Sequence, residues 1–500
     1  MTRRNFMIAA GLSACLCATG SVAVASNIAD DTDVRAKLLL ADAWIETQLA
    51  YDRVPGASFA LVHDQELVWA KGYGFSNLET KSPATPDTKY SICSVSKLFT
   101  SIAVMQLRDA GRVSIDSPLS EILDWYDLPP APTAEEAVTL RAVLSHVAGL
   151  PREAATPYWT EVDFPGRDVV RAELAAQQPL YNPYDRFQYS NLGMTLAGEA
   201  VTAASGQDYH DYVRANILRP LGLKDTHSEL PEKDYGKSMA VGYMLPGEDG
   251  TRPAVDYYPV RAIAPAAGYA STVRDLGKFA SWQFRLLDQG GENVLKATTL
   301  REMQRVHWVA PDFDGPAWGL GFAFTRDGGN TFVGHGGYCP GYRTAFLMRR
   351  ESKVAVIAMV NVNDVSPSRM ARILYGLTAG AIAEAANGSD AENGKTKKGG
   401  KPRKQTKNKD ADYSVYQGRY TRPGFPTGIA VGAGRDGLFM TEIYSSNPVT
   451  RMRTLVPVED HIFRVIDTKG READTVRFEV DDKGRPVRLW RHGNYLERSG

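Results

Sequence analysis

Hydrophobic periodicity in the first part of the chain indicates both helices and strands. Residues 33–50 have the pattern of an amphipathic helix, and residues 58–62 and 67–70 are two apolar runs separated by a short turn, as in a strand pair. Apolar side chains return at helical spacing over residues 98–107, and residues 191–204 combine small residues with a helical pattern. The sequence therefore predicts a domain that mixes helices with strands.

Such patterns continue to about residue 386. Residues 225–265 are rich in Gly, Pro, Tyr and charged residues, which is typical of loops around a site. Residues 318–322 fit a single strand, and residues 342–348 and 353–362 predict two further strands that are adjacent to each other. A helix over residues 368–386 is expected to follow, because a proline stands just before it.

The composition changes sharply after this helix. Residues 387–412 contain almost no apolar side chains and are crowded with Lys, Gly and polar residues, so they are predicted to form a disordered linker. A basic arm that contacts a membrane surface or a cell-wall polymer is the alternative. Residues 413–500 carry short strand-like runs separated by turns such as Asp436-Gly437, which predicts a small antiparallel barrel or sandwich.

The N-terminus has the pattern of an export signal. Residues 1–25 are predicted to be a signal peptide, since Arg3 and Arg4 precede a continuous stretch of apolar and small residues. The arginine pair resembles a twin-arginine signal, which implies export in the folded state, and Ala-Val-Ala before Ser26 suits a signal peptidase. A lipoprotein box ending in Cys15 is the competing interpretation and would anchor the protein to a membrane face. Both interpretations predict an exported protein, periplasmic or secreted.

Composition limits the class of protein. The chain has 500 residues, of which 43% are hydrophobic and 23% charged, which is normal for a globular protein of more than one domain. The formal net charge is zero, which argues against a nucleic-acid partner. Beyond the N-terminal stretch, no segment is long and apolar enough to span a bilayer. The eight histidines show no metal-ligand spacing, so neither a metal nor another cofactor is expected.

Ser94 and Lys97 carry the strongest chemical signal in the sequence. A serine hydroxyl needs a base within hydrogen-bond reach to act as a nucleophile. The G-x-S-x-G turn of α/β-type hydrolases does not occur in this chain. The spacing S-x-x-K instead places Lys97 on the same helix face as Ser94, and the first turn of such a helix offers free N–H donors that suit an oxyanion.

Two further motifs occur once each, as S-x-x-K does. Tyr189-x-Asn191 is the Y-x-N motif, and His335-x-Gly337 is the H-x-G motif. Each motif by itself is explained equally well by a helix start, a turn or a strand end. All three in this order are far more specific, and they resemble the family of class C β-lactamases, D,D-peptidases, D-aminopeptidases and related esterases.

The resemblance covers about residues 35–385. Further matching stretches are Val54-Pro55-Gly56, Lys71-Gly72-Tyr73-Gly74, Leu144 to Pro151 and Gly268 to Thr272. It implies an α+β fold for residues 33–386, with an antiparallel sheet flanked by helices and an additional helical region. Residues 413–500 are similar to the lipocalin-like C-terminal domain of some members, which implies a small antiparallel β-barrel.

For the chemistry, the resemblance implies an acyl-enzyme formed on Ser94. Tyr189 and Lys97 would form a coupled pair that takes the serine proton and returns it to the leaving group. Which of the two is the base stays open, because both groups ordinarily titrate near pH 10. Asn191 would hydrogen-bond to the substrate or orient Lys97. The backbone N–H of Tyr338 would be the second oxyanion donor.

The strand at His335, Gly336 and Gly337 would form the far wall of the site. Many β-lactamases and D,D-peptidases have lysine where this chain has His335, and a neutral histidine supplies no fixed charge for a substrate carboxylate. Arg343 is expected either to supply that contact or to be a solvated strand residue. The expected substrate is therefore an ester, an amide or a D-amino-acid peptide, as a small molecule or short peptide.

Two other features near the motifs have structural interpretations. Cys93 and Cys339 are the two cysteines outside the predicted signal peptide. In the family fold their segments face each other across the cleft, so a disulfide is one interpretation, but two small packed side chains are favoured. His146 is interpreted as a residue that holds a loop through hydrogen bonds.

The sequence thus predicts a serine hydrolase and leaves two alternatives. One is a β-lactamase or D,D-carboxypeptidase that acts on β-lactams or cell-wall peptides. The other is a non-catalytic penicillin-binding sensor or cell-wall-binding protein, against which the complete set of Ser94, Lys97, Tyr189 and Asn191 argues.

Overall fold

The computed structural model of the chain describes residues 27–131, 136–154, 156–309, 317–392, 412–422 and 427–499. The predicted signal peptide and residues 393–411 of the predicted linker lie outside these described residues. Within the described ranges, no helix has the length and apolar character needed to cross a membrane.

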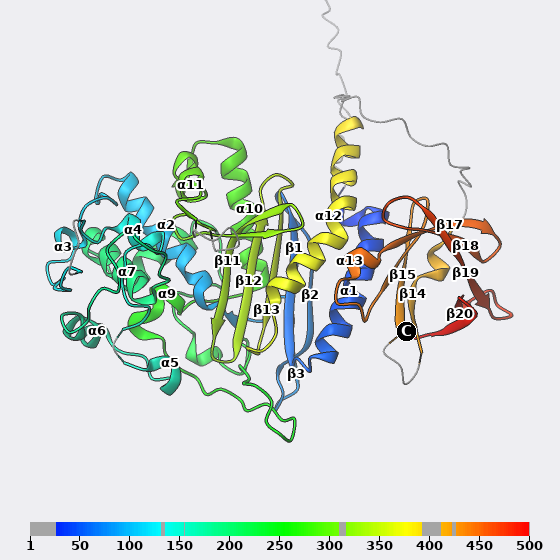
Figure 1. Ribbon diagram of the computed structural model, residues 1–500, viewed down its shortest axis with the longest axis horizontal. Helices are drawn as coiled ribbons and strands as arrows, with labels where there is room; N and C mark the ends of the chain where they lie inside the picture. Colours follow the sequence, from blue (N-terminus) through cyan, green and yellow to red (C-terminus); the bar gives the residue numbers. More distant parts are fainter. Residues whose placement is uncertain are drawn as a thin grey trace, which may run out of the picture.

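A nine-stranded antiparallel sheet lies at the centre of the larger part of the molecule (Figure 1). Its strands, in spatial order, are β3 (Ser82–Pro83), β2 (Glu66–Asn77), β1 (Gly56–His63), β13 (Val354–Val360), β12 (Tyr342–Arg349), β11 (Asn330–Cys339), β10 (Ala323–Asp327), β9 (Ala317–Trp318) and β8 (Trp308–Val309). The early strand β1 pairs with the late strand β13, so that Ala60 lies opposite Ile357. The predicted strand pairs over residues 58–70 and 342–362 are confirmed.

Helices cover both faces of this sheet (Figure 1). One face packs against α2 (Ser96–Asp109) and α10 (Val273–Gln289), and the other against α1 (Thr32–Tyr51) and α12 (Pro367–Glu392). Every residue of β13 is buried as a result, with Ile357 in one core and Val356 in the other. The helix predicted over residues 368–386 is present and continues to Glu392.

A helical region extends the core on the α2 side of the sheet. Its main helix is α7 (Asn191–Ser205), which packs against α2 and the short α9 (Ala264–Ala267). The remaining short elements of this part are α3 (Leu119–Ile122), α4 (Leu140–Leu144), α5 (Tyr158–Glu161), α6 (Arg167–Leu174), α8 (Tyr209–Val213), α11 (Ala297–Met303), and the strand pairs β4 (Tyr90–Ser91) with β5 (Ala270–Ser271) and β6 (Glu292–Asn293) with β7 (Leu295–Lys296).

The single strand predicted over residues 318–322 is wrong, because the chain turns within it. Strand β9 ends at Trp318, and the backbone passes through Gly321, at a φ of 82°, before β10 begins. A Cβ atom on Gly321 would lie 2.1 Å from the Oγ of Ser101 on α2. The close approach of α2 therefore requires a turn that only glycine fits.

Eight antiparallel strands close into a barrel in the C-terminal part (Figure 1). They are β14 (Gly418–Thr421), β15 (Gly428–Gly434), β16 (Gly437–Glu442), β17 (Arg453–Glu459), β18 (Ile462–Ile466), β19 (Glu472–Val480), β20 (Pro486–Arg491) and β21 (Asn494–Arg498), with α13 (Pro448–Arg451) between β16 and β17. Buried apolar side chains such as Leu438, Leu455 and Phe478 fill its interior. The predicted barrel is confirmed, and its centre is a packed core.

Helix α1 lies between the sheet and the barrel (Figure 1). Trp44 belongs to the core under the sheet, whereas Leu40 and Ala43 pack with Ile443 of the barrel part. Both sides of the helix are therefore covered, and buried side chains occur all round it. The prediction of an amphipathic helix over residues 33–50 is right about the helix and wrong about its exposed face.

The barrel touches α1 through the backbone at Gly432. A Cβ atom there would lie 2.6 Å from the carbonyl oxygen of Ala36. We expect Gly432→Ala to lower the free energy of unfolding by about 1–3 kcal/mol, the usual cost of overpacking, as measured by urea denaturation. In the control Gly380→Ala on α12, the new Cβ meets nothing within 4 Å, and a gain of about 0.5–1 kcal/mol is expected. Equal stability of the two variants would contradict this packing.

Candidate active site

Ser94 lies where a short turn becomes a helix. Residues Cys93–Val95 form the 3₁₀ turn η2, and α2 follows directly. Cys93 has a positive φ of 49°, which is uncommon for a residue other than glycine. The Ser96 hydroxyl fixes the junction, because it donates to the carbonyl of Cys93 at 2.5 Å and accepts from the N–H of Tyr269 at 3.0 Å. Ser94 is thus held at the N-terminal end of α2.

The Lys97 amine is buried beside Ser94. Its Nζ lies 3.2 Å from the Ser94 Oγ, and it donates to Asn191 Oδ1 at 2.7 Å and to the Ala266 carbonyl at 2.8 Å. Burial lowers the pKa of Lys97 well below 10.5, although the Glu153 carboxylate acts in the opposite direction. Two of the three contacts of Nζ are with groups that only accept, and the third faces Ser94.

Glu153 orients Asn191, and the sequence did not single it out. The Asn191 Nδ2 donates to both oxygens of the Glu153 carboxylate, at 2.8 and 3.0 Å. Because a carboxylate only accepts, this contact turns the Asn191 Oδ1 towards Lys97. The hydroxyl of Tyr158 also donates to Glu153. In the sequence, the one signal for Glu153 is its position, two residues after the matching stretch that ends at Pro151.

Tyr189 also contacts Ser94. Burial raises the pKa of the Tyr189 phenol well above 10, and a hydrogen bond with the Ser94 side chain offsets this only in part. His146 stacks on the Tyr189 ring at a centroid distance of 4.3 Å, and its Nδ1 accepts from the N–H of Ser190 at 3.2 Å. Trp318 packs against both rings. His146 therefore holds the Tyr189 loop, in agreement with its structural interpretation.

His335 is buried and uncharged. Its Nδ1 lies 2.6 Å from the Gly336 carbonyl, so this nitrogen carries the proton. Burial, together with the nearby Lys97 amine, lowers the pKa of His335 to about 3. The wall of the site at this position therefore presents a neutral ring.

The tip of β11 has a free edge beside Ser94. Strand β10 pairs with β11 only as far as Gly334, and from there β12 is its one strand partner within the described sheet. Cys339 and Tyr342 flank the two-residue turn and form the last pair of the β11–β12 hairpin. Hydrogen-bonded pairs alternate with non-hydrogen-bonded pairs along such a hairpin, so the N–H of Tyr338 points away from β12. That N–H is free to meet a ligand.

The predicted residues meet at one cleft of about 280 Å³. Its lining includes Ser94, Arg152, Tyr189, His335, Gly336, Gly337, Tyr338 and Arg343. Lys97 lies behind Ser94 and is hydrogen-bonded to it, and Asn191 in turn accepts a hydrogen bond from Lys97. The structure thus brings every predicted site residue to a single place.

Two guanidinium groups stand at this cleft. Arg152, which the sequence did not single out, lies 5.0 Å from the Tyr189 ring centroid and forms an ion pair with Glu153 at 3.1 Å. Arg343 lies 5.3 Å from the Tyr338 ring centroid, and its contacts with described residues include no ion pair. Arg343 is therefore the cation that is available to a substrate carboxylate.

A disulfide joins Cys93 to Cys339, with their Cα atoms 5.8 Å apart. Both residues are buried. The favoured prediction of two packed, unlinked thiols is therefore wrong. That prediction underestimated how closely the tip of β11 approaches the turn before Ser94.

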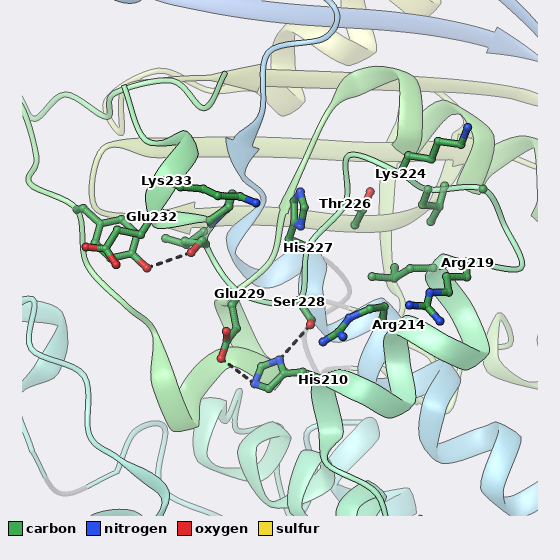
Figure 2. Close-up of a pocket in the computed structure, with 16 residues that line it drawn as sticks. His210, Arg214, Arg219, Lys224, Thr226, His227, Ser228, Glu229, Glu232 and Lys233 are labelled. Atoms are coloured by element: carbon green, nitrogen blue, oxygen red, sulfur yellow. Dashed lines mark hydrogen bonds and ion pairs between the residues drawn. The ribbon is translucent and has the colours of Figure 1, made fainter. Parts of the chain in front are cut away.

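A larger cavity of about 800 Å³ lies elsewhere and contains none of the predicted residues (Figure 2). In it, His210 Nδ1 lies 3.0 Å from the Ser228 Oγ, and His210 Nε2 lies 3.1 Å from a Glu229 oxygen (Figure 2). These contacts fasten the 226–230 loop to α8. Among the described residues, no three His, Cys, Asp or Glu side chains gather as a metal site would require.

The family described as Beta-lactamase matches residues 41–380 of the chain. Protein flp of Staphylococcus aureus (strain COL) is 24% identical over 327 residues, which are 65% of this chain and 63% of the relative. Beta-lactamase-like protein 2 of Dictyostelium discoideum is 29% identical over 310 residues, which are 60% of this chain and 54% of the relative. The chain thus spans less than two thirds of the length of these relatives.

Solved structures share the fold. The octameric penicillin-binding protein homologue from Pyrococcus abyssi aligns with a TM-score of 0.60 at 23% identity, over 91% of this chain and 99% of the other. The D-amino acid amidase from Ochrobactrum anthropi SV3 aligns with a TM-score of 0.56 at 26% identity, over 70% of this chain and 99% of the other. The first alignment is long enough to include the barrel, whereas the second spans about the length of the larger part alone.

Proposed function

The chain belongs to the β-lactamase family, and we propose that it is a serine hydrolase that forms an acyl-enzyme on Ser94. Its substrate carries an ester, amide or D-amino-acid peptide bond. The observation that carries this proposal is the buried Lys97 amine, 3.2 Å from the Ser94 hydroxyl and otherwise surrounded by acceptors. Members of this fold family are generally serine hydrolases.

Lys97 is assigned as the base that activates Ser94. In its neutral form the amine donates both protons, to Asn191 and Ala266, and its lone pair then faces the Ser94 hydroxyl. The lowered pKa of Lys97 makes this form more abundant than it is for an exposed lysine at the same pH. The raised pKa of Tyr189 keeps its phenol protonated in the free protein, so Tyr189 is not the first base.

The remaining steps use the other groups of the cleft. As the Ser94 Oγ attacks the carbonyl carbon, the developing oxyanion accepts from the N–H groups of Ser94 and Tyr338. Tyr189 donates its phenolic proton to the leaving group and regains a proton from the Lys97 ammonium, whose Nζ lies 4.7 Å from the Tyr189 ring centroid. Water then attacks the acyl-enzyme, with Lys97 and Tyr189 again moving the protons.

The charges at the cleft guide the choice of substrate. The neutral His335 ring supplies no cation beside the nucleophile, whereas Arg343 offers one at the rim. The related D-amino acid amidase, solved with D-phenylalanine, supports D-amino-acid amides as substrates to be tested. A β-lactam or a cell-wall peptide is the second candidate, because both carry a carboxylate that Arg343 would bind.

Labelling with a fluorophosphonate probe tests the assignment of the nucleophile. We expect wild type to be labelled on Ser94, as located by peptide mass spectrometry, and Ser94→Ala to lose at least about 99% of ester hydrolysis. The matched control is Ser228→Ala, which removes the serine of the larger cavity and should label as wild type does. Equal labelling of wild type and Ser94→Ala would refute the proposal.

The pH dependence of kcat/KM tests the role of Lys97. A lysine with its ordinary pKa of 10.5 would be about 0.3% neutral at pH 8, so the rate would still rise tenfold per pH unit there. Because burial lowers the pKa of Lys97, we expect the rate to stop rising at a pH well below 10.5 and to fall on the acid side of that plateau.

Glu153→Gln extends this test. The Glu153 carboxylate raises the pKa of Lys97, so its removal should shift the acid limb to lower pH and reduce kcat/KM about tenfold through the misoriented Asn191. Glu161→Gln, at an exposed position on α5, should leave the profile in place. An unmoved acid limb in Glu153→Gln would exclude the electrostatic role of this carboxylate.

Arg343→Gln tests the carboxylate contact. We expect KM for substrates with a carboxylate to rise about tenfold or more, the usual effect of losing a charged hydrogen bond, while neutral p-nitrophenyl esters change less than about twofold. Arg326→Gln, at an exposed position on β10, is the control for surface charge. An equal change for both substrate classes would show that Arg343 does not read the carboxylate.

A further inference from the structure

The Cys93–Cys339 disulfide lies next to both backbone N–H groups that the proposed function assigns to the oxyanion. Cys93 is the residue before Ser94, and Cys339 is the residue after Tyr338. The disulfide therefore links the residues adjacent to the two donors, although these residues are 246 positions apart in the sequence. The mechanism above makes no chemical use of the sulfur atoms.

The two backbones touch at this point. A Cβ atom on Gly337 would lie 2.4 Å from the carbonyl oxygen of Ile92 and 3.2 Å from the Cβ of Cys93. No residue larger than glycine fits there without a shift of the β11 tip or of the turn. The distance between the tip of β11 and the turn before Ser94 thus has little tolerance.

Few hydrogen bonds hold this contact. The β11 tip lacks a strand neighbour on this side, because β10 pairs only as far as Gly334. The Ser91 hydroxyl lies 3.3 Å from the Cys339 sulfur, and the Ser91 carbonyl accepts from the Thr344 hydroxyl at 3.4 Å. The first contact is with a weakly accepting sulfur and the second is long, so the covalent disulfide is the strongest connection between the two segments.

We propose that the Cys93–Cys339 disulfide is a clamp that sets the spacing of the two oxyanion donors, so that Ser94 is acylated at full rate only when the bond is formed. This inference rests on the proposed function of Ser94. The cysteines act as positioning residues, through the backbone of Ser94 and Tyr338.

The expected kinetic effect follows from when the oxyanion forms. Donors must lie about 2.7–3.1 Å from the oxyanion, and a misplacement of about 1 Å can cost a hundredfold in rate. Because the full negative charge develops only in the transition state, loosening the clamp lowers kcat and leaves KM nearly unchanged. We expect a loss of about tenfold or more in the acylation rate.

Formation of the clamp links activity to the compartment. Two cysteine thiols lose two protons and two electrons, and a disulfide of an oxidoreductase accepts them to become a dithiol. Such oxidation takes place outside the cytosol. A chain exported in the folded state, as its N-terminal sequence predicts, would therefore remain weakly active until it reaches an oxidising compartment.

Reduction of the purified full-length protein tests the clamp. A water-soluble phosphine takes up the oxygen of one water, becomes the phosphine oxide and converts the disulfide to two thiols, which iodoacetamide labelling and peptide mass spectrometry count. We expect the rate of fluorophosphonate labelling at Ser94 and kcat for an ester to fall together as thiols appear at Cys93 and Cys339. Both should recover on reoxidation with oxidised glutathione.

Variants supply the controls. The double variant Cys93→Ala/Cys339→Ala should have a low acylation rate that the phosphine does not change. The double variant Cys15→Ser/Cys17→Ser should keep the wild-type acylation rate and should lose activity on reduction as the wild type does. If the first variant does not fold, as judged by circular dichroism, reduction of the wild type decides alone.

Three results would overturn the clamp: an unchanged acylation rate after complete reduction, a change in KM alone, or loss of tertiary circular dichroism along with the activity. Absence of any Ser94 labelling in the oxidised protein is a different outcome, because it would refute the proposed function itself.

Discussion

The burial of the Lys97 amine is the constraint on which the site depends. A charged lysine in apolar surroundings costs several kcal/mol unless it is well solvated by protein groups, so the fold must surround it with acceptors or leave it neutral. Three elements meet for this purpose: α2 carries Lys97, α7 begins at Asn191, and α9 supplies the Ala266 carbonyl. The helices can approach so closely because of Gly198, where a Cβ atom would lie 2.2 Å from the Cγ of Pro265. The packing of the helical region therefore helps to set the protonation state of Lys97.

Glu153 adjusts this balance from behind the site. Burial lowers the pKa of Lys97, and the Glu153 carboxylate raises it. The same carboxylate fixes the orientation of Asn191, so the charge and the geometry around the amine depend on one side chain. Arg152 and Tyr158 in turn hold Glu153 in place. The two effects together give Lys97 a pKa below that of an exposed lysine but above the pKa that burial alone would produce.

The sequence predicts the parts of this protein that depend on local pattern. Ser94 and Lys97 are recognisable because their spacing follows the helix period, and the strands near residues 58–70 and 342–362 because apolar runs mark them. Glu153 was not predicted, since one acidic residue in a loop carries no periodic signal and acts only through contacts with residues distant in sequence. The exposed face expected for the 33–50 helix failed for a similar reason: the barrel that covers α1 belongs to a region about 400 residues later. Close approaches, such as those of Gly321 and of the Cys93–Cys339 pair, arise from tertiary packing that periodicity does not encode.

The neutral state of His335 follows mainly from its own burial, and the nearby Lys97 amine lowers the pKa of His335 further. A positive charge on this ring would lose its solvation, and it would also lie near the Lys97 amine. A guanidinium on the neighbouring strand avoids this cost of burial, because Arg343 on β12 is only half-buried. The positive charge at the cleft is therefore carried by Arg343 and not by the ring of His335 in the wall.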